Sequence, residues 1–333
     1  MTASSVTGIG NGSVDIPTTQ KLDVDITLLK HFGRNIVFVG KNGNDNNDGR
    51  SFFTPFATFG AAINALASFS PVPSAQNNYS IVCLDAGPYV GNVITPEYVH
   101  VYAPFACVHG AVIVGNESRI KIGRLINTGL EDLSAYGGLT GVAVQRVAIG
   151  GDSHVDIDEI ESNGVGGVVN HGSSGILEFH CQHIRVKAGA NPSYAAAIGT
   201  RDDGSSHIHA VVTSIDLQAD NAIGIVAVDD ANDILADIGH ITTEEGAVDT
   251  IGVFCEGGLI NVNALQIKAT VPLWVYSAGE NTANVNATCT QICATDADEL
   301  TAYAYFVGAG NLNLITAKLE GDTSGSANTL IPS

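Results

Sequence analysis

Apolar residues between positions 118 and 319 recur in rows of one fixed pattern. In each row the first, third, fifth and eighth positions are apolar, apart from Ser118, Ser153 and Thr316. The alternation predicts a strand with one buried face, and the three-residue step predicts a bend followed by a second strand. The rows are Ser118/Ile120/Ile122/Leu125, Ser153/Val155/Ile157/Ile160, Leu177/Phe179/Cys181/Ile184, Ile208/Ala210/Val212/Ile215, Ile234/Ala236/Ile238/Ile241, Ile260/Val262/Ala264/Ile267, Val285/Ala287/Cys289/Ile292 and Leu312/Leu314/Thr316/Leu319.

The spacing of the rows predicts how the strands are arranged. Successive rows start 35, 24, 31, 26, 26, 25 and 27 residues apart, and a period in the twenties is typical of a solenoid of stacked coils. The two longest intervals hold GLEDLSAYGG and GANPSYAA, which we interpret as inserted loops. About ten coils would form a rod about 45–50 Å long. A second apolar segment precedes most rows and predicts the returning side of each coil: Val165–Val169, Ala195–Ile198, Ile223–Val228, Ile251–Cys255, Leu273–Tyr276 and Tyr303–Val307.

Residues 36–66 have a different pattern, which predicts a strand, a polar loop and an amphipathic helix. The strand is Ile36–Val39, the loop is Gly40–Ser51, and the helix follows Thr54-Pro55. The loop reads GNDNNDG and the helix start reads TPFATFGAAI. This segment resembles the N-terminal cap of right-handed parallel β-helix proteins of the pectate-lyase and phage-tailspike kind. An end of a solenoid needs such a cover, since it exposes unpaired backbone and apolar interior.

The resemblance implies an all-β fold, a right-handed single-stranded parallel β-helix with an N-terminal capping helix. We divide the chain accordingly into an N-terminal arm or attachment segment (1–35), a strand-loop-helix cap (36–80), the parallel β-helix (81–320) and a C-terminal tail (321–333). High Gly content and few charged residues favour many strands joined by tight turns.

Two outward columns of the predicted coils are polar. Asn261, Asn286 and Asn313 follow the first position of their rows and are expected to form a ladder of stacked amides. The position before the last in each row forms the second column, which we interpret as a solvent-facing corner, with a ligand groove as the alternative. It consists of Arg124, Glu159, His183, Ser214, His240, Gln266, Gln291 and Lys318.

Charge and hydropathy exclude several classes of partner. A formal net charge of −20 disfavours nucleic acid and anionic membranes. No apolar run approaches the roughly 20 residues of a membrane helix. The N-terminus lacks the basic and apolar regions of a secretory signal, so we expect synthesis in a cytoplasm. The six cysteines include no CxxC pair and are interpreted as reduced core thiols.

Neither a metal nor another cofactor is predicted. His180 with His183, and His207 with His209, lack Cys or carboxylate partners at a recognised ligand spacing, so surface histidines are the simpler interpretation. Residues 45–48 resemble half of an EF-hand loop, but Pro55 occupies the position of the bidentate Glu. Asn and Asp side chains can build this turn without calcium.

Catalysis is the alternative hypothesis. Enzymes with the resembled fold act on polysaccharides through carboxylates on one outer face, and Asp202, Asp229 and Glu256 precede successive rows. Asp203 and Asp230 accompany them, and Arg201 precedes Asp202. Against catalysis, turns commonly contain Asp, and the chain has only one Trp for a carbohydrate groove.

The leading hypothesis is a non-enzymatic bacteriophage structural protein on the virion surface, namely a capsid decoration protein, a head fibre or a small spike. The resemblance implies a homotrimer, with residues 1–35 bound to a capsid or tail protein and with host-surface glycans as a further partner. A polysaccharide-degrading tailspike or lyase is the alternative, and a bacterial surface adhesin is a third hypothesis that the missing signal disfavours.

Overall fold

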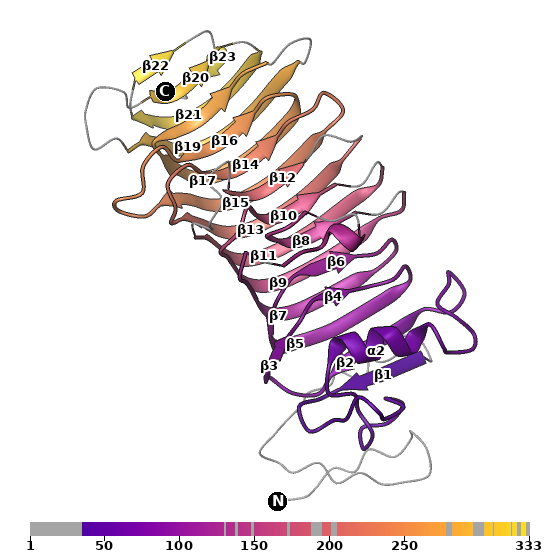
Figure 1. The fold of residues 1–333 in the computed structure, drawn as a ribbon. Helices are drawn as coiled ribbons and strands as arrows, with labels where there is room; N and C mark the ends of the chain where they lie inside the picture. The colour runs from indigo at the N-terminus through magenta and orange to yellow at the C-terminus, as the bar shows by residue number, and fades with distance from the viewer. Residues whose placement is uncertain are drawn as a thin grey trace, which may run out of the picture.

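The computed structural model describes residues 35–129, 131–136, 139–147, 150–171, 174–187, 195–200, 205–277, 282–295, 303–308, 310–320, 322–324 and 328–330. Nearly all of its regular structure is strand, arranged in two long parallel sheets (Figure 1). The expectation of an all-β chain built from parallel strands is therefore confirmed. From β3 onward, strands of one sheet alternate along the chain with strands of the other.

The larger sheet contains 13 strands, and we call it the long sheet. Twelve of them follow one another in chain order, and β3 pairs with β5 beside this path. They are β1 (Asn35–Val39), β2 (Tyr79–Cys83), β3 (Pro88–Val90), β5 (Val99–His109), β7 (Arg119–Asn127), β9 (Ser153–Ser162), β11 (Ile176–Val186), β13 (His207–Leu217), β15 (Asp233–Thr243), β17 (Gly258–Ala269), β19 (Ala283–Ala294), β21 (Asn311–Glu320) and β23 (Asn328–Leu330).

The smaller sheet has 10 strands, and we call it the short sheet. Its last strand and β23 continue both sheets into residues 321–333. The strands are β4 (Val93–Ile94), β6 (Val112–Val114), β8 (Val142–Arg146), β10 (Gly166–Asn170), β12 (Ala195–Thr200), β14 (Ala222–Ala227), β16 (Ile251–Cys255), β18 (Val271–Val275), β20 (Tyr303–Val307) and β22 (Asp322–Ser324).

The predicted inward positions form one apolar cluster that includes residues of both sheets. The rows are in register, so the third position of each pairs with the third position of the next, from Ile120 through Phe179 to Leu314. All row positions are buried except Leu319, which is partly buried. The three polar exceptions bond backbone carbonyls: the hydroxyls of Ser118, Ser153 and Thr316 donate to Pro96, Gly115 and Lys318.

The predicted amide ladder is confirmed on the outer face of the long sheet. The Asn286 side chain donates to Asn261 (2.8 Å), and Asn313 donates to Asn286 (2.7 Å). A second, unpredicted ladder runs beside it, where Asn311 donates to Asn284 (2.8 Å). In-register parallel pairing produces both ladders, because equivalent side chains of adjacent strands lie about 4.8 Å apart.

The segment before the stack folds as a strand, a loop and a helix. The helix α2 (Phe59–Leu66) begins after Thr58, whose side chain accepts from the Ala61 N–H. Phe59, Ala62 and Leu66 are buried and belong to the same apolar cluster as the sheets. A Cβ on Gly49 would lie 2.2 Å from the Phe56 ring, and its φ of +66° also favours glycine.

The acidic side chains of the loop serve its own backbone. One oxygen of Asp45 accepts from the N–H groups of Ala57 (2.8 Å) and Thr58 (3.0 Å). Asp48 accepts from the Arg50 N–H (3.1 Å) and the Thr54 hydroxyl (2.7 Å). These bonds lower the pKa of Asp48, the Arg50 N–H being the main cause. The interpretation as a turn built by Asp side chains is confirmed, since both carboxylates act as local acceptors.

Arg146 is a fully buried cation at the end of β8, which sequence reasoning did not identify. Its guanidinium donates to the carbonyls of Gly150 (2.8 Å) and Ser174 (2.7 Å) and to that of Gly151. It also donates to the side chains of Asn116 and Asn170, each at 3.3 Å. Burial lowers its pKa, an effect that Asp152 opposes. One side chain thus joins the turns that precede β7, β9 and β11.

Arg146→Met is expected to destabilise the fold by at least about 2 kcal/mol, because buried acceptors lose their donor while Met retains most of the volume. Arg119→Met, on the exposed face of β7, is the matched control and should change stability by less than about 0.5 kcal/mol. Urea unfolding followed by circular dichroism measures both. Equal midpoints for the two variants would contradict a structural role for Arg146.

Candidate functional site

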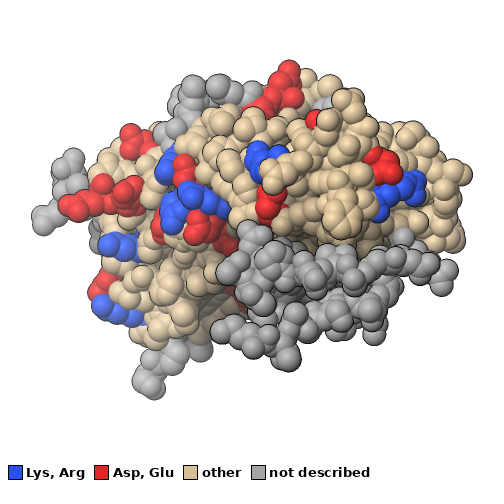
Figure 2. All heavy atoms as spheres, turned by 90° about the horizontal axis from the view of Figure 1, so that it is seen from below, with Lys and Arg blue, Asp and Glu red and all other residues tan. Residues whose placement is uncertain are grey.

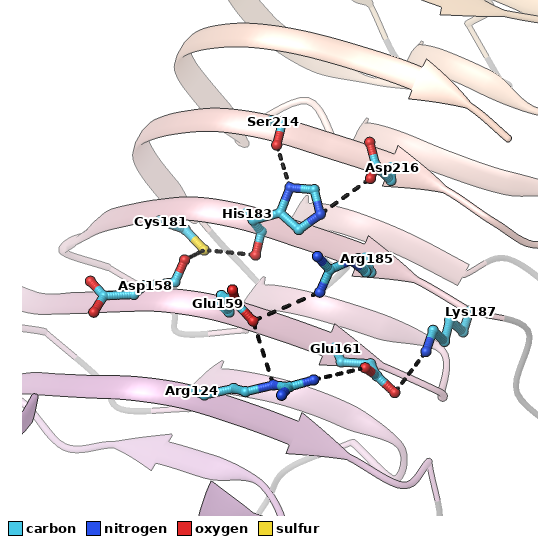
Figure 3. Close-up of polar contacts among 10 residues, drawn as sticks. All are labelled: Arg124, Asp158, Glu159, Glu161, Cys181, His183, Arg185, Lys187, Ser214 and Asp216. Atoms are coloured by element: carbon cyan, nitrogen blue, oxygen red, sulfur yellow. Dashed lines mark hydrogen bonds and ion pairs between the residues drawn. The ribbon is translucent and has the colours of Figure 1, made fainter. Parts of the chain in front are cut away.

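A group of ion-paired side chains lies on the outer face of β7, β9, β11 and β13 (Figure 3). We call it the charged cluster. These strands pair in register, so their outward side chains form columns across the coils. In the face seen in Figure 2, Lys and Arg also lie beside Asp and Glu in small groups. The cluster consists of Lys121, Arg124, Asp156, Asp158, Glu159, Glu161, His183, Arg185, Lys187 and Asp216.

Lys121 holds two carboxylates of the next strand. Its ammonium lies 2.8 Å from Asp156, its register partner, and 2.6 Å from Asp158. Alternation along β9 directs both Asp side chains outward, so one cation can reach both. Partial burial opposes the charge of Lys121, but the hydrogen bonds to the two carboxylates outweigh it and raise the pKa.

Arg124 joins the two glutamates of β9. Its guanidinium lies 3.5 Å from Glu159 and 3.4 Å from Glu161. The next strand supplies a second cation to each, since Arg185 lies 3.8 Å from Glu159 and Lys187 lies 2.9 Å from Glu161. The hydrogen bond from Lys187 is the main cause of the lowered pKa of Glu161, and burial opposes it. The two glutamates of β9 therefore lie between bases of both neighbouring strands.

The histidines of this face do not converge. His183 contacts Ser214 through one ring nitrogen and Asp216 through the other (3.2 Å). His180 instead packs edge-on against the His154 ring, with centroids 5.0 Å apart. His207 pairs with Asp233 (3.3 Å), and His209 is exposed. Among the described residues, no group of three or more His, Cys, Asp or Glu could hold a metal ion.

Cys181 lies beneath the charged cluster and is unsuited to nucleophilic chemistry. Its thiol is buried and contacts the backbone carbonyls of Asp158 and His183. Burial is the main cause that raises its pKa to about 12, so the thiol stays protonated at neutral pH. All six cysteines are free, and four are buried.

The geometry of the charged cluster favours cross-linking of coils over acid–base chemistry. A general acid needs a carboxyl whose pKa is raised, whereas the carboxyl groups that depart from their ordinary pKa among the described residues all have lowered values. Each half-exposed pair contributes about 0.2–1 kcal/mol. Together the pairs fasten four neighbouring strands side to side.

The predicted turn carboxylates are used in different ways. Asp202, with Asp203 and Arg201, lies outside the described residues. The Asp229 side chain accepts from the Asp230 N–H (2.6 Å), and Asp230 accepts from the Thr282 N–H. Asp229 therefore binds the backbone of its own turn, as turn residues do, whereas Asp230 binds the backbone of a residue 52 positions later in the chain.

Glu256 differs from these turn residues. It is half-buried, and its carboxylate makes no hydrogen bond or ion pair with any described residue. It follows β16 directly, and the backbone N–H of Tyr276 donates to Cys255 (2.9 Å), which places Tyr276 on the adjacent coil. Cys255 and Val275 belong to the core, so alternation directs Glu256 and Tyr276 outward.

Aromatic rings continue this outer strip of the short sheet, which we call the aromatic strip: Phe254, Glu256, Trp274 and Tyr276. Phe254 and Trp274 are register partners with ring centroids 5.4 Å apart, and Tyr276 is 45% exposed. Sequence reasoning counted one Trp and overlooked that both of its register partners, Phe254 and Phe306, are aromatic. Aligning the returning segments of the coils would have revealed the strip.

Comparison with known proteins identifies no relative, since no family model, no curated protein and no solved structure matches this chain. None of the helices described is long and apolar enough to cross a membrane.

Glu161→Gln is expected to lower stability at pH 7 by about 1 kcal/mol or less, because the ion pairs are partly exposed. A lowered pKa contributes stability above the ordinary value of 4.5, and this contribution is lost as the pH falls through the folded value. The difference between wild type and variant should therefore shrink as the pH falls below 4.5. Glu245→Gln, an exposed residue outside the cluster, is the control. Thermal unfolding over a pH series from 7 downward through the acid range measures both, and a difference that does not shrink with falling pH would contradict the assignment.

Proposed function

We propose that this chain is a non-enzymatic structural protein of a bacteriophage particle, exposed on the virion surface as a capsid decoration protein, head fibre or small spike. It would be made in the host cytoplasm, assemble as a trimer and attach to a capsid or tail protein through residues 1–35. The resemblance of residues 36–66 to the caps of virion β-helices supports the assignment to a phage.

We infer further that the two sheets are walls of a right-handed single-stranded parallel β-helix of about ten coils. The regular alternation of strands between the sheets supports this arrangement. In this architecture α2 caps the first coil. The burial of Phe59, Ala62 and Leu66 in the common apolar cluster supports that role.

The observation that carries the structural role is the mutual pairing of charges in the charged cluster. Glu159 and Glu161 each contact two cations, and Lys121 contacts both Asp156 and Asp158. Nearby cations favour the ionised form of a carboxyl group, and the pKa of Glu161 is lowered accordingly, with the hydrogen bond from Lys187 as the main cause. Such a face suits a stiff rod that must persist outside a cell.

Antibodies raised against the purified chain are expected to label intact virions of the source phage, as seen by electron microscopy. Label spread over the head indicates a decoration protein or fibre, and label at the tail tip indicates a spike. Antibody preabsorbed with the chain is the control. Particles that carry no specific label would overturn the proposal of a virion component.

The aromatic strip favours glycan binding as a second candidate function. Aromatic rings stack against the apolar faces of sugars, and the Glu256 carboxylate, with no described partner, can accept hydrogen bonds from hydroxyl groups. This arrangement would serve adhesion to a host surface. It would serve the alternative, polysaccharide cleavage, only if a second carboxylate lies across the bound sugar.

Tyr276→Ala is expected to weaken binding to a host-surface polysaccharide about tenfold through loss of one stacking ring. Phe105→Ala, which removes a 65% exposed ring of β5, is the control and should leave binding unchanged. Binding is measured by calorimetry, and released reducing ends report cleavage. Equal binding by both variants would exclude the strip as the glycan site, and cleavage abolished by Glu256→Gln would establish the enzymatic alternative.

A further inference from the structure

The outer face of the long sheet loses its charges toward the C-terminal strands. On β7, β9 and β11 the outward positions include Arg119, Lys121, Asp156, Asp158 and Glu178. The equivalent positions on β17, β19 and β21 carry no charge. We call these residues the uncharged face: Asn261, Asn263, Leu265, Asn286, Thr288, Thr290, Asn313, Ile315 and Ala317.

The uncharged face is exposed and held in a fixed shape. Leu265 is 57% exposed and Ile315 is 45% exposed. Beside them the amide ladder of Asn261, Asn286 and Asn313 fixes three side chains in line. A surface so ordered loses little conformational entropy when a partner docks.

Charged side chains border this face on two sides. Asp237, on the preceding strand, accepts a hydrogen bond from the neutral Asn263 side chain (2.8 Å). Lys318, at the corner beyond Ala317, forms an ion pair with Glu320. The surface therefore has an uncharged centre of amides, hydroxyls and aliphatic groups and a charged rim, which is the anatomy of a protein–protein interface.

We propose that the uncharged face is the contact between copies of this chain. Each copy carries a formal charge of −20, so two copies repel over most of their surfaces and can meet closely only where carboxylates are absent. The proposal rests on the trimer of the proposed function and deepens it, because it names the surface that turns toward the threefold axis. The paired charges of β7, β9 and β11 would then lie away from the closest contact.

The test compares two identical substitutions at equivalent positions of different coils. Thr290→Asp places a carboxylate on the uncharged face, and Thr213→Asp places one at the same position of β13. Both threonines are exposed, so neither change should affect folding, which circular dichroism verifies. Sedimentation equilibrium of the full chain measures the mass.

Wild type and Thr213→Asp are expected to sediment as trimers, and Thr290→Asp is expected to associate at least about 100-fold more weakly, because like charges are brought together at the contact. Association of wild type should also strengthen with salt, since raising the ionic strength from about 0.01 M to about 0.15 M shortens the Debye length from roughly 30 Å to 8 Å. A monomeric wild type, or a Thr290→Asp protein that remains trimeric, would overturn the proposal. Antibody labelling of virions tests the proposed function separately. The interface proposal can therefore fail while the virion assignment holds, and the reverse.

Discussion

In-register pairing of parallel strands is the constraint on which the remaining structure depends. Once Ile120 is opposite Val155 and Val155 is opposite Phe179, every side chain acquires a neighbour of equivalent position on the coils before and after it. For inward positions this stacks aliphatic groups into a continuous core. For outward positions it places equivalent side chains about 4.8 Å apart. Charges of the same sign in one column would repel, so each column needs alternating charges or uncharged residues.

The outer columns resolve this problem in two ways. Near the N-terminal end, β9 supplies acids between bases on β7 and β11, so neighbouring charges have opposite sign. Near the C-terminal end, amides replace the charged side chains, and Asn286 donates to Asn261 on one neighbouring strand and accepts from Asn313 on the other. The first solution makes the face salt-sensitive, and the second produces a surface that is neutral within a strongly acidic chain.

The core was predictable because buried strand positions recur at a fixed spacing of apolar residues in the sequence. Most of the polar sites were not predictable. The eight rows and the ladder from Asn261 to Asn313 follow from spacing alone. Predicting the charged cluster requires knowing that Lys121 is in register with Asp156. The rows imply this register, but it was applied to the inward positions and not to these outward ones. Arg146 is the last residue of β8, and its burial depends on backbone carbonyls of turns, which carry no sequence signal. Glu256 was a candidate catalytic residue because it is an acid in a turn. Its position beside Tyr276 was not predicted, because Tyr276 belongs to the neighbouring strand segment.

Arg146 also determines how much of the stack must come apart together. Its guanidinium contacts Asn116, 30 residues before it, and Ser174, 28 residues after it. Opening of a single strand at this point would leave the cation or its carbonyl acceptors without partners, so the adjoining strands are coupled. The smallest cooperative unit here therefore spans several strands, and the amide hydrogens of β7, β8, β9 and β10 are expected to exchange as one group.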